Sequence, residues 1–350
     1  MFSLKPRYHH GKNKHVVTPD HEYSADLVIR WGHAATVVGN TLYIHGGKID
    51  QSNGYSYNSA PNTDELLALN FERSFDLSST PWTTLNATGG PLVAFHTITA
   101  HSTSQALVFG GDAGTSVPLP TRNDSAWQLT INGASASWTS HSEGWADQPM
   151  RRRYHSSVVY KDIVYIIGGE RTDGSNIAFS QPYAFDPSGP TFTAIATADG
   201  PPGLVGHAAL ALGDGRIVVL GGLSRSTSAL LPLDTVYIYN VMQSSWSTLT
   251  IGGGSTPAPR RNFAATVINS DKILIHGGAD ASCQTALSDG AILDLTKLQW
   301  STVPALSEAL GSRLDHTAVT LGTSVLFLFG EHTGTNSYEC TLTFPRLRRD

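Results

Sequence analysis

The chain is poor in several features that mark large protein classes. Only 15% of its 350 residues are charged, and it has two cysteines and three methionines. No apolar run approaches the roughly 18 residues that a membrane-spanning helix needs. The net charge of −5 argues against a general nucleic-acid-binding surface, which requires an excess of basic residues. We therefore expect neither nucleic-acid binding nor membrane insertion by this chain.

Familiar catalytic signatures are absent as well. The sequence has no Gly-x-Ser-x-Gly elbow, no His-Glu-x-x-His pair, no P-loop and no dinucleotide-binding fingerprint. Residues 1–22 lack the apolar core of a signal peptide and begin with a basic, polar stretch, which predicts a flexible tail. Residues 346–350 form a basic C-terminal stub. The segment 23–345 is therefore expected to hold the folded domain.

Glycine, in contrast, is abundant and periodic, with 34 residues in the chain. An apolar, strand-like run ends in a glycine pair five times, and a sixth run ends in Gly-Glu. The pairs are Gly46–Gly47, Gly110–Gly111, Gly168–Gly169, Gly221–Gly222 and Gly277–Gly278, and the sixth is Gly330–Glu331. A repeat of roughly 50–60 residues is typical of a radially arranged β-structure.

Each glycine pair has the same neighbours in the sequence. A short strand with small residues precedes it and usually begins with histidine: His33, His96, His155, His207 and His316, with Phe263 in the fifth unit. A variable loop and a third strand follow, and then a large aromatic residue: Trp82, Trp138, Trp246 and Trp300, with Phe192 in the third unit. This order predicts a four-stranded antiparallel sheet. A single sheet of this kind cannot bury both faces, so the units are expected to fold only as a stack.

The order of strand, Gly-Gly, strand and tryptophan resembles the kelch repeat, from about residue 25 to about residue 345. Kelch repeats fold as β-propellers, so the resemblance implies an all-β, six-bladed and monomeric kelch-type propeller. The sixth unit ends without a tryptophan strand of its own. We expect residues 26–31 to supply its outer strand, so that the N-terminal strand joins the last blade and closes the ring.

Charged residues gather at the face that carries the loops before each first strand and after each glycine pair, here called the loop face. They are Arg30, Arg152, Arg153, Arg260, Arg261 and Arg313, followed after the glycines by Asp112, Glu170, Asp280 and Glu331. The kelch resemblance implies partner-peptide binding through arginines at such positions, Arg153 and Arg261 above all, because guanidinium groups suit carboxylates. Tyr154 would add aromatic contact, as would Trp31, Tyr55, Tyr57 and Phe95. The alternative is that these charges only neutralise one another.

An enzymatic role is the second hypothesis. Propellers that resemble galactose oxidase need a cysteine beside a tyrosine ligand and two histidines, but Cys283 has no nearby tyrosine and Cys340 follows Tyr338 on an outer strand. The iron-site spacing of the kelch-like proteins that steer glucosinolate breakdown is also missing. One histidine per unit would surround the axis too widely to bind a metal. We expect no metal or cofactor, while a cyclase-like or carbohydrate-binding site in the axial opening stays open.

The compartment is left open by the sequence. Cys283 and Cys340 lie on neighbouring units and could form a disulfide, and Asn86 and Asn123 begin glycosylation sequons. A chain trimmed from a longer protein would fit an extracellular or cell-surface glycoprotein, whereas a complete one would be cytoplasmic. In either setting we predict a non-catalytic scaffold that binds a protein or peptide at the arginine-rich loop face.

Overall fold

The regular structure is almost entirely β. The computed structural model describes residues 16–18, 30–49, 57–72, 80–114, 124–331 and 340–343, the first and last of these by backbone alone. Its described part contains a single α-helix, α1 (Pro304–Leu310). All pairings between neighbouring strands of the main sheets are antiparallel, except one short parallel addition.

The first three main sheets each have four strands. They are β3 (Ala34–Val38), β4 (Thr41–His45), β6 (Leu66–Asn70) and β7 (Thr83–Thr84); β8 (Ala94–Ala100), β9 (Gln105–Asp112), β10 (Ala126–Asn132) and β11 (Ser135–Thr139); and β12 (Arg153–Tyr160), β13 (Ile163–Glu170), β14 (Tyr183–Asp186) and β15 (Thr191–Ala194). Each sheet runs in chain order from its first strand to its last.

The next three sheets repeat the pattern. The fourth has β17 (Ala208–Ala211), β18 (Arg216–Leu220), β21 (Thr235–Asn240) and β22 (Ser245–Thr250), and the fifth has β24 (Ala264–Asn269), β25 (Lys272–His276), β26 (Gly290–Asp294) and β27 (Gln299–Thr302), with β23 (Gly253–Gly254) added in parallel. The sixth has β28 (Thr317–Leu321), β29 (Ser324–Leu328), β30 (Cys340–Thr343) and β1 (Val16–Thr18). Short strands join the loops: β2 (Arg30–Trp31) with β5 (Lys48–Ile49), and β16 (Leu204–Val205) with β19 (Leu223–Ser224) and β20 (Ala229–Leu230).

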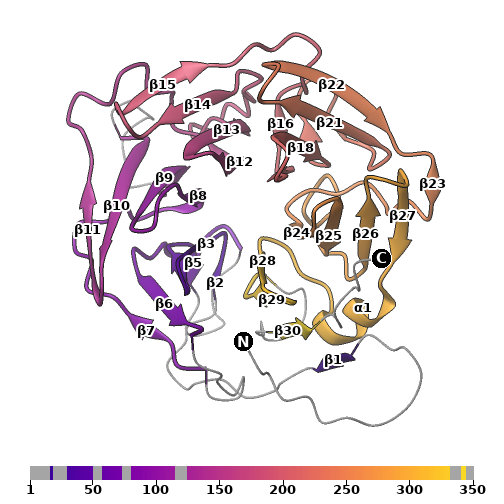
Figure 1. Cartoon of the computed structure of the whole chain (residues 1–350), viewed down its shortest axis with the longest axis horizontal. Helices are drawn as coiled ribbons and strands as arrows, with labels where there is room; N and C mark the ends of the chain where they lie inside the picture. The colour runs from indigo at the N-terminus through magenta and orange to yellow at the C-terminus, as the bar shows by residue number, and fades with distance from the viewer. Residues whose placement is uncertain are drawn as a thin grey trace.

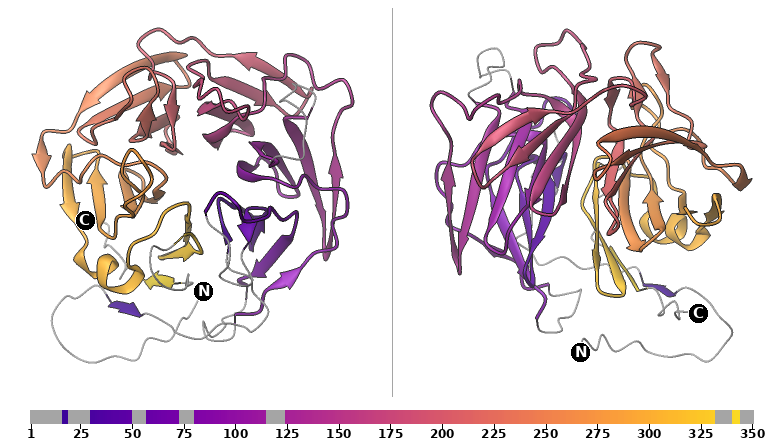
Figure 2. Two further views of the ribbon diagram at one scale, coloured as in Figure 1. Left: turned by 180° about the vertical axis from the view of Figure 1, so that it is seen from behind. Right: turned by 45° about the horizontal axis from the view of Figure 1, so that its top comes forward.

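The sheets stand around a common centre, with the first strand of each sheet innermost (Figure 1). The reverse and tilted views show the same arrangement (Figure 2). Hydrophobic clusters fill the space between neighbouring sheets. One of them joins Leu42 and Ile44 of the first sheet to Leu326 and Leu328 of the sixth. The first and last sheets along the chain are therefore packed against each other.

The outer edge of the sixth sheet is formed by a different segment from the one expected. Val16–Thr18 pairs with β30, although the sequence placed these residues in the flexible tail 1–22. The assignment of this strand to residues 26–31 is wrong, because Arg30–Trp31 pair with β5 of the first repeat; residues 26–29 lie outside the described residues. Arg30 bonds Glu65 and Trp31 stacks on Tyr57, which holds both in their own repeat.

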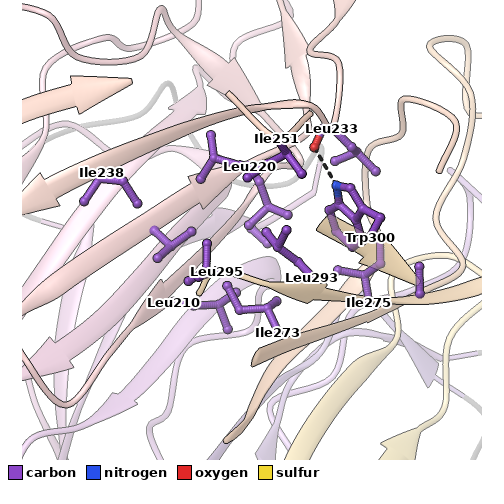
Figure 3. Close-up of a cluster of buried hydrophobic side chains, with 14 of the residues drawn as sticks. Leu210, Leu220, Leu233, Ile238, Ile251, Ile273, Ile275, Leu293, Leu295 and Trp300 are labelled. Atoms are coloured by element: carbon purple, nitrogen blue, oxygen red, sulfur yellow. Dashed lines mark hydrogen bonds between the residues drawn. The ribbon is translucent and has the colours of Figure 1, made fainter. Parts of the chain in front are cut away.

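The tryptophans of the outer strands pack between sheets, as the repeat predicted. Trp300 is 2% exposed and lies among Leu233, Ile251 and Leu293 (Figure 3). Its indole N–H donates a hydrogen bond to the carbonyl of Leu233 in the preceding repeat at 2.9 Å. Trp138 and Trp246 make the same kind of bond, at 2.9 Å, to carbonyls of Ala87 and Ala196. Each indole therefore fills a gap between repeats and also ties their backbones together.

The glycine pairs lie at the seams between sheets. The first glycine of each of the five pairs has a positive φ, and the ring that opens the next repeat's first strand packs against it. At Gly168 a Cβ atom would lie 2.5 Å from Cε1 of His207, so no side chain fits there.

The sixth pair is displaced by one residue from the prediction. The N–H of Gly330 donates to the carbonyl of Arg30 at 2.9 Å, as the second glycine Gly278 does to Arg313 at 2.8 Å. Gly330 is therefore the second residue of the pair, and Phe329, with φ of 50°, takes the place of the first glycine. The sequence misled here because the one glycine of the sixth pair was aligned with the first position of the pair instead of the second.

Candidate functional site at the loop face

A ring of six residues surrounds the central axis at the loop face; we call it the collar. Each member directly precedes the first-strand ring residue of its repeat and has a positive φ: Gly32, Phe95, Tyr154, Gly206, Asn262 and Asp315. Collar residues of neighbouring repeats are joined by hydrogen bonds from the backbone N–H of one to the backbone carbonyl of the other. The donor and acceptor pairs are Gly32 and Asp315 at 3.1 Å, Asp315 and Asn262 at 3.0 Å, Asn262 and Gly206 at 2.8 Å, Gly206 and Tyr154 at 2.9 Å, and Phe95 and Gly32 at 2.6 Å. These bonds tie the repeats together around the axis.

The collar and the rings beneath it line an open cavity of about 130 Å³. Burial lowers the pKa of His96 to about 3 and that of His207 to about 4, so these imidazoles are neutral at physiological pH. His96 bonds His45 at 3.0 Å, and His316 bonds His276 at 3.0 Å. Among the described residues, no group of three or more His, Cys, Asp and Glu side chains could hold a metal ion. The histidine rings that open the first strands pack against the glycine pairs at the seams.

Aromatic side chains cover one side of the collar. Tyr57 stacks on Trp31 with a centroid distance of 6.2 Å and lies 5.9 Å from the ring of Phe95. Phe95 in turn lies 4.6 Å from the ring of Tyr154. The hydroxyl of Tyr57 donates a hydrogen bond to Asp315 of the sixth repeat and lies 3.4 Å from the hydroxyl of Tyr154 of the third. Tyr57 thus connects residues from four repeats.

A charged cluster lies beside the aromatic residues, across the second, third and fourth repeats. Glu170 is 1% exposed and accepts hydrogen bonds from Arg153 at 3.2 Å and from Arg225 at 2.7 Å. Arg153 also donates to Asp112 at 2.8 Å. The side chains of Arg153 and Arg225 keep 24% and 28% of their surface exposed. Both guanidinium groups are therefore held in fixed positions and still face solvent.

Arg261 lies on the other side of Tyr154. Its guanidinium carbon is 5.4 Å from the centroid of the Tyr154 ring, and that of Arg153 is 5.3 Å away. Arg261 is only 6% exposed and donates to the side-chain oxygen of Asn262 at 3.2 Å. Tyr154 is thus in contact with two arginines, which fixes its ring at the collar.

Four of the predicted partner-binding arginines lie in the interior. Arg30, Arg152, Arg260 and Arg313 are at most 1% exposed. Each donates a hydrogen bond to the carbonyl of the first residue of its own glycine pair, which is Gly46, Gly168, Gly277 and Phe329 respectively, at 3.4, 3.1, 2.9 and 3.2 Å. The expectation that all six arginines face the loops is therefore corrected. The interior four stand three residues before the first-strand ring, where the side chain points under the turn.

Two further predicted partner-binding residues, Asp280 and Glu331, make contacts within their own loops or with a neighbouring backbone. Asp280 shapes its own loop by accepting bonds from Ser282 at 2.9 Å and Gln284 at 3.1 Å. The backbone of Glu331 pairs with that of Leu314.

Cys283 is half-buried, and the side chain of Cys340 lies outside the described residues, so their disulfide stays a prediction. Asn86 is exposed and Asn123 lies outside the described residues, so glycosylation also stays untested. Tyr55 falls outside them as well.

Sequence reasoning missed Arg225, Asn262 and Asp315. A signal existed for the two collar residues, because each occupies the position directly before a strand-opening ring. Arg225 had none, since its loop has no counterpart at a fixed spacing in the other repeats.

Comparison with known proteins gives a consistent result. The KLHDC2/KLHL20/DRC7 Kelch-repeats domain model matches residues 24–222 and 95–331. The chain is similar to the dynein alpha chain of the flagellar outer arm from Chlamydomonas reinhardtii, with 31% identity over 180 residues, which cover 49% of this chain and 4% of that protein. Adagio protein 3 from Arabidopsis thaliana is 27% identical over 195 residues, covering 55% and 30%.

Putative adagio-like protein 2 from Oryza sativa subsp. japonica is 26% identical over 341 residues, covering 91% of this chain and 50% of the relative. The chain thus spans at most about half the length of these curated relatives. None of the helices in the described part is long and apolar enough to cross a membrane.

Proposed function

Because the chain belongs to the kelch-repeat family, we propose that it is a protein-interaction scaffold that binds a protein or peptide partner at the loop face. We propose further that residues 23–345, together with Val16–Thr18, form one six-bladed propeller. The main support is that Gly330 donates to the carbonyl of Arg30 at the seam between the sixth and first sheets, which repeats the glycine-to-arginine backbone bond of three other seams. The pairing of β1 with β30 would then close the ring.

The observation that carries the binding proposal is the cluster of Arg153, Glu170 and Arg225. Both oxygens of the buried Glu170 are occupied by these two arginines, one from each of two neighbouring repeats. The guanidinium groups are thereby held in place before any partner arrives, so little side-chain entropy is lost on binding. Their remaining N–H groups suit a carboxylate or a backbone carbonyl of a peptide.

Apolar side chains flank this cluster. Leu92 is 51% exposed and Ile177 is 53% exposed, and both belong to loops of the same face. Asn62 links one flank to the cluster, because its amide donates to the carbonyls of Asp112 at 2.7 Å and Leu92 at 3.5 Å. Exposed apolar residues beside fixed polar groups are typical of peptide-binding surfaces. The surface therefore fits an extended peptide that carries an acidic and an apolar residue.

The experiment is a selection from a displayed peptide library against the full chain. Peptides that bind are then measured by calorimetry on the double variant Arg153→Ala/Arg225→Ala. We expect at least about a tenfold loss of affinity, since charged hydrogen bonds contribute about 1.5–3 kcal/mol each.

Arg216→Ala is the matched control. Arg216 is also a partly exposed arginine that bridges two carboxylates, Asp214 and Asp271. It lies at the start of β18, the end of that strand that points away from the loop face. Unchanged affinity in the double variant, or an equal loss in the control, would overturn the proposal.

A further inference from the structure

The open cavity at the centre of the collar is lined by residues from all six repeats and has a volume of about 130 Å³. Among the described residues that line it, Asp315 is the one acidic residue, and there is no lysine or arginine. The lining also contains the histidines that open the first strands, which are His33, His96, His155, His207 and His316.

The histidines leave the charge of Asp315 unbalanced. Burial lowers the pKa of His96 to about 3 and that of His207 to about 4, and it holds the pKa of the other three well below 6.5. All five imidazoles are therefore neutral at physiological pH. The described lining carries one negative charge when Asp315 is ionised, and an anion entering the cavity would meet no cation there.

Asp315 is half-buried and has no salt bridge among the described residues. The polar and titratable groups that face it are Tyr57, which donates a hydrogen bond, and Tyr154, Arg261, Asn262 and Cys283. Arg261 is the one cation among them, and its guanidinium group packs on the ring of Tyr154. The carboxylate at the cavity therefore lacks a close counter-ion.

Two aromatic rings line the same cavity. The rings of Phe95 and Tyr154 lie 4.6 Å apart. Only Gly32 stands between Phe95 and Asp315: its N–H donates to the carbonyl of Asp315 at 3.1 Å, and a Cβ atom on it would lie 2.5 Å from Cδ1 of Phe95. An aromatic ring beside an unpaired carboxylate is a combination that suits an ammonium group.

We propose that the axial cavity binds a primary ammonium group at the end of an unbranched alkyl chain, with Asp315 as its counter-ion and Phe95 and Tyr154 as its aromatic walls. A lysine side chain and a small free amine share this chemistry. A hard metal ion does not fit, because it needs several oxygen ligands and the lining offers one carboxylate. None of Arg153, Glu170 and Arg225 lines the cavity, so the site is separate from the proposed partner surface.

The affinity should depend on pH in a defined direction. Burial raises the pKa of Asp315 from 3.8 to about 6, and only the ionised carboxylate attracts the ammonium group. The ammonium group itself stays charged, because its ordinary pKa is about 10.4. Binding should therefore be strongest above pH 6 and become about tenfold weaker between pH 7.5 and 5. A carboxylate with an ordinary pKa would keep its affinity down to about pH 4.

The test titrates the full chain, with ¹³C-labelled phenylalanine and tyrosine rings, with n-butylammonium chloride at pH 7.5. 1-Butanol and sodium butyrate serve as neutral and anionic analogues. The resonances of Phe95 and Tyr154 are assigned by their loss in Phe95→Leu and Tyr154→Phe. We expect saturable shifts of both resonances with butylammonium and with neither analogue. No saturable shift with butylammonium, or an equal shift with 1-butanol, would overturn the proposal.

Asp315→Asn removes the counter-ion and should weaken butylammonium binding at least about tenfold. Asp271→Asn is the matched control, because it makes the same change of charge directly before β25, beside Arg216 and away from the collar. The pH series on the unaltered chain keeps the proposal testable if Asp315→Asn does not fold. Unchanged affinity in Asp315→Asn, or constant affinity between pH 7.5 and 5, would contradict the site.

A competition experiment distinguishes the two sources of the ammonium group. The peptide acetyl-Gly-Lys-Gly-amide is added to the butylammonium complex, with norleucine in place of lysine as its control. Displacement by the lysine peptide alone assigns the cavity to a lysine side chain, whereas binding of butylammonium without displacement assigns it to a free amine. Either result supports the ammonium site, and equal displacement by the norleucine peptide would overturn it.

Discussion

Two neighbouring arginines show how the interior and the loop face of this protein differ. Arg152 is 1% exposed and donates to the carbonyl of Gly168 at 3.1 Å, while Arg153 keeps 24% of its side chain exposed beside Asp112 and Glu170. Because successive side chains of an extended backbone point to opposite sides, one position places a guanidinium under the turn and the next places it on the face. The same residue type therefore has a structural role at one position and a proposed binding role at the other.

The interior arginines satisfy a need of the backbone. At four of the six glycine pairs, a buried arginine donates to the carbonyl of the first residue and satisfies an acceptor at the end of the strand. Arg260 donates such a bond to Gly277 at 2.9 Å and is itself paired with Asp289 through bonds of 2.9 and 2.7 Å. Arg152 is stabilised differently, because its guanidinium carbon lies 4.1 Å from the centroid of the Phe179 ring. Burial lowers its pKa to about 10, yet it remains charged at neutral pH.

The largest expected effect concerns the interior histidines and is a loss of stability in acid. Burial holds the pKa of His96 and His276 at about 3 and of His207 at about 4, below the ordinary 6.5. The unfolded chain therefore binds more protons below pH 6.5, and the free energy of unfolding falls as pH decreases towards 4. Each histidine contributes up to about 1.4 kcal/mol per pH unit.

Chemical denaturation at pH 7.5, 6 and 5 measures this loss. A matched variant exists, because Phe263 occupies the equivalent place in the fifth repeat. His207→Phe should therefore flatten the pH dependence. Equal stability at pH 7.5 and 5 would show that the histidines are not the buried neutral groups described here.

The next effect separates the two arginines directly. Arg152→Ala should lower the free energy of unfolding by about 3 kcal/mol or more, because it leaves the carbonyl of Gly168 without its donor and opens a cavity beside Phe179. Arg153→Ala should cost less than Arg152→Ala, because Arg153 is partly exposed and Arg225 still pairs with Glu170 in that variant. Denaturation of both variants in one buffer tests the pair. Similar losses for the two would remove the distinction between interior and loop face.

The sequence predicted the repeat and the role of the tryptophans well, because both depend on local patterns. The spacing of the glycine pairs was enough to place the strands of the first five sheets, and Trp300 lies where its position in the repeat indicates. The error at Phe329 shows the limit of such patterns. A bulky residue at positive φ cannot be recognised from spacing when the expected glycine lies one position later.

The site was less predictable, for physical reasons. Which way an arginine points depends on how its strand enters the turn, and only the structure shows that the position three residues before the ring, that of Arg152, is the interior one. The outer strand of the sixth sheet is likewise decided by tertiary packing. Trp31 packs with Tyr57 of its own repeat and Phe95 of the second repeat, and Val16–Thr18 pairs with β30 instead.

The central claim is that a partner contacts the loop face while the interior arginines only support it. Hydrogen–deuterium exchange of the full chain, with and without a selected peptide, tests it most directly. The account predicts slower exchange in the segments around Arg153, Glu170 and Arg225, and no change at the turn before Arg216. Protection concentrated at the turn before Arg216, with none around Arg153, would contradict it.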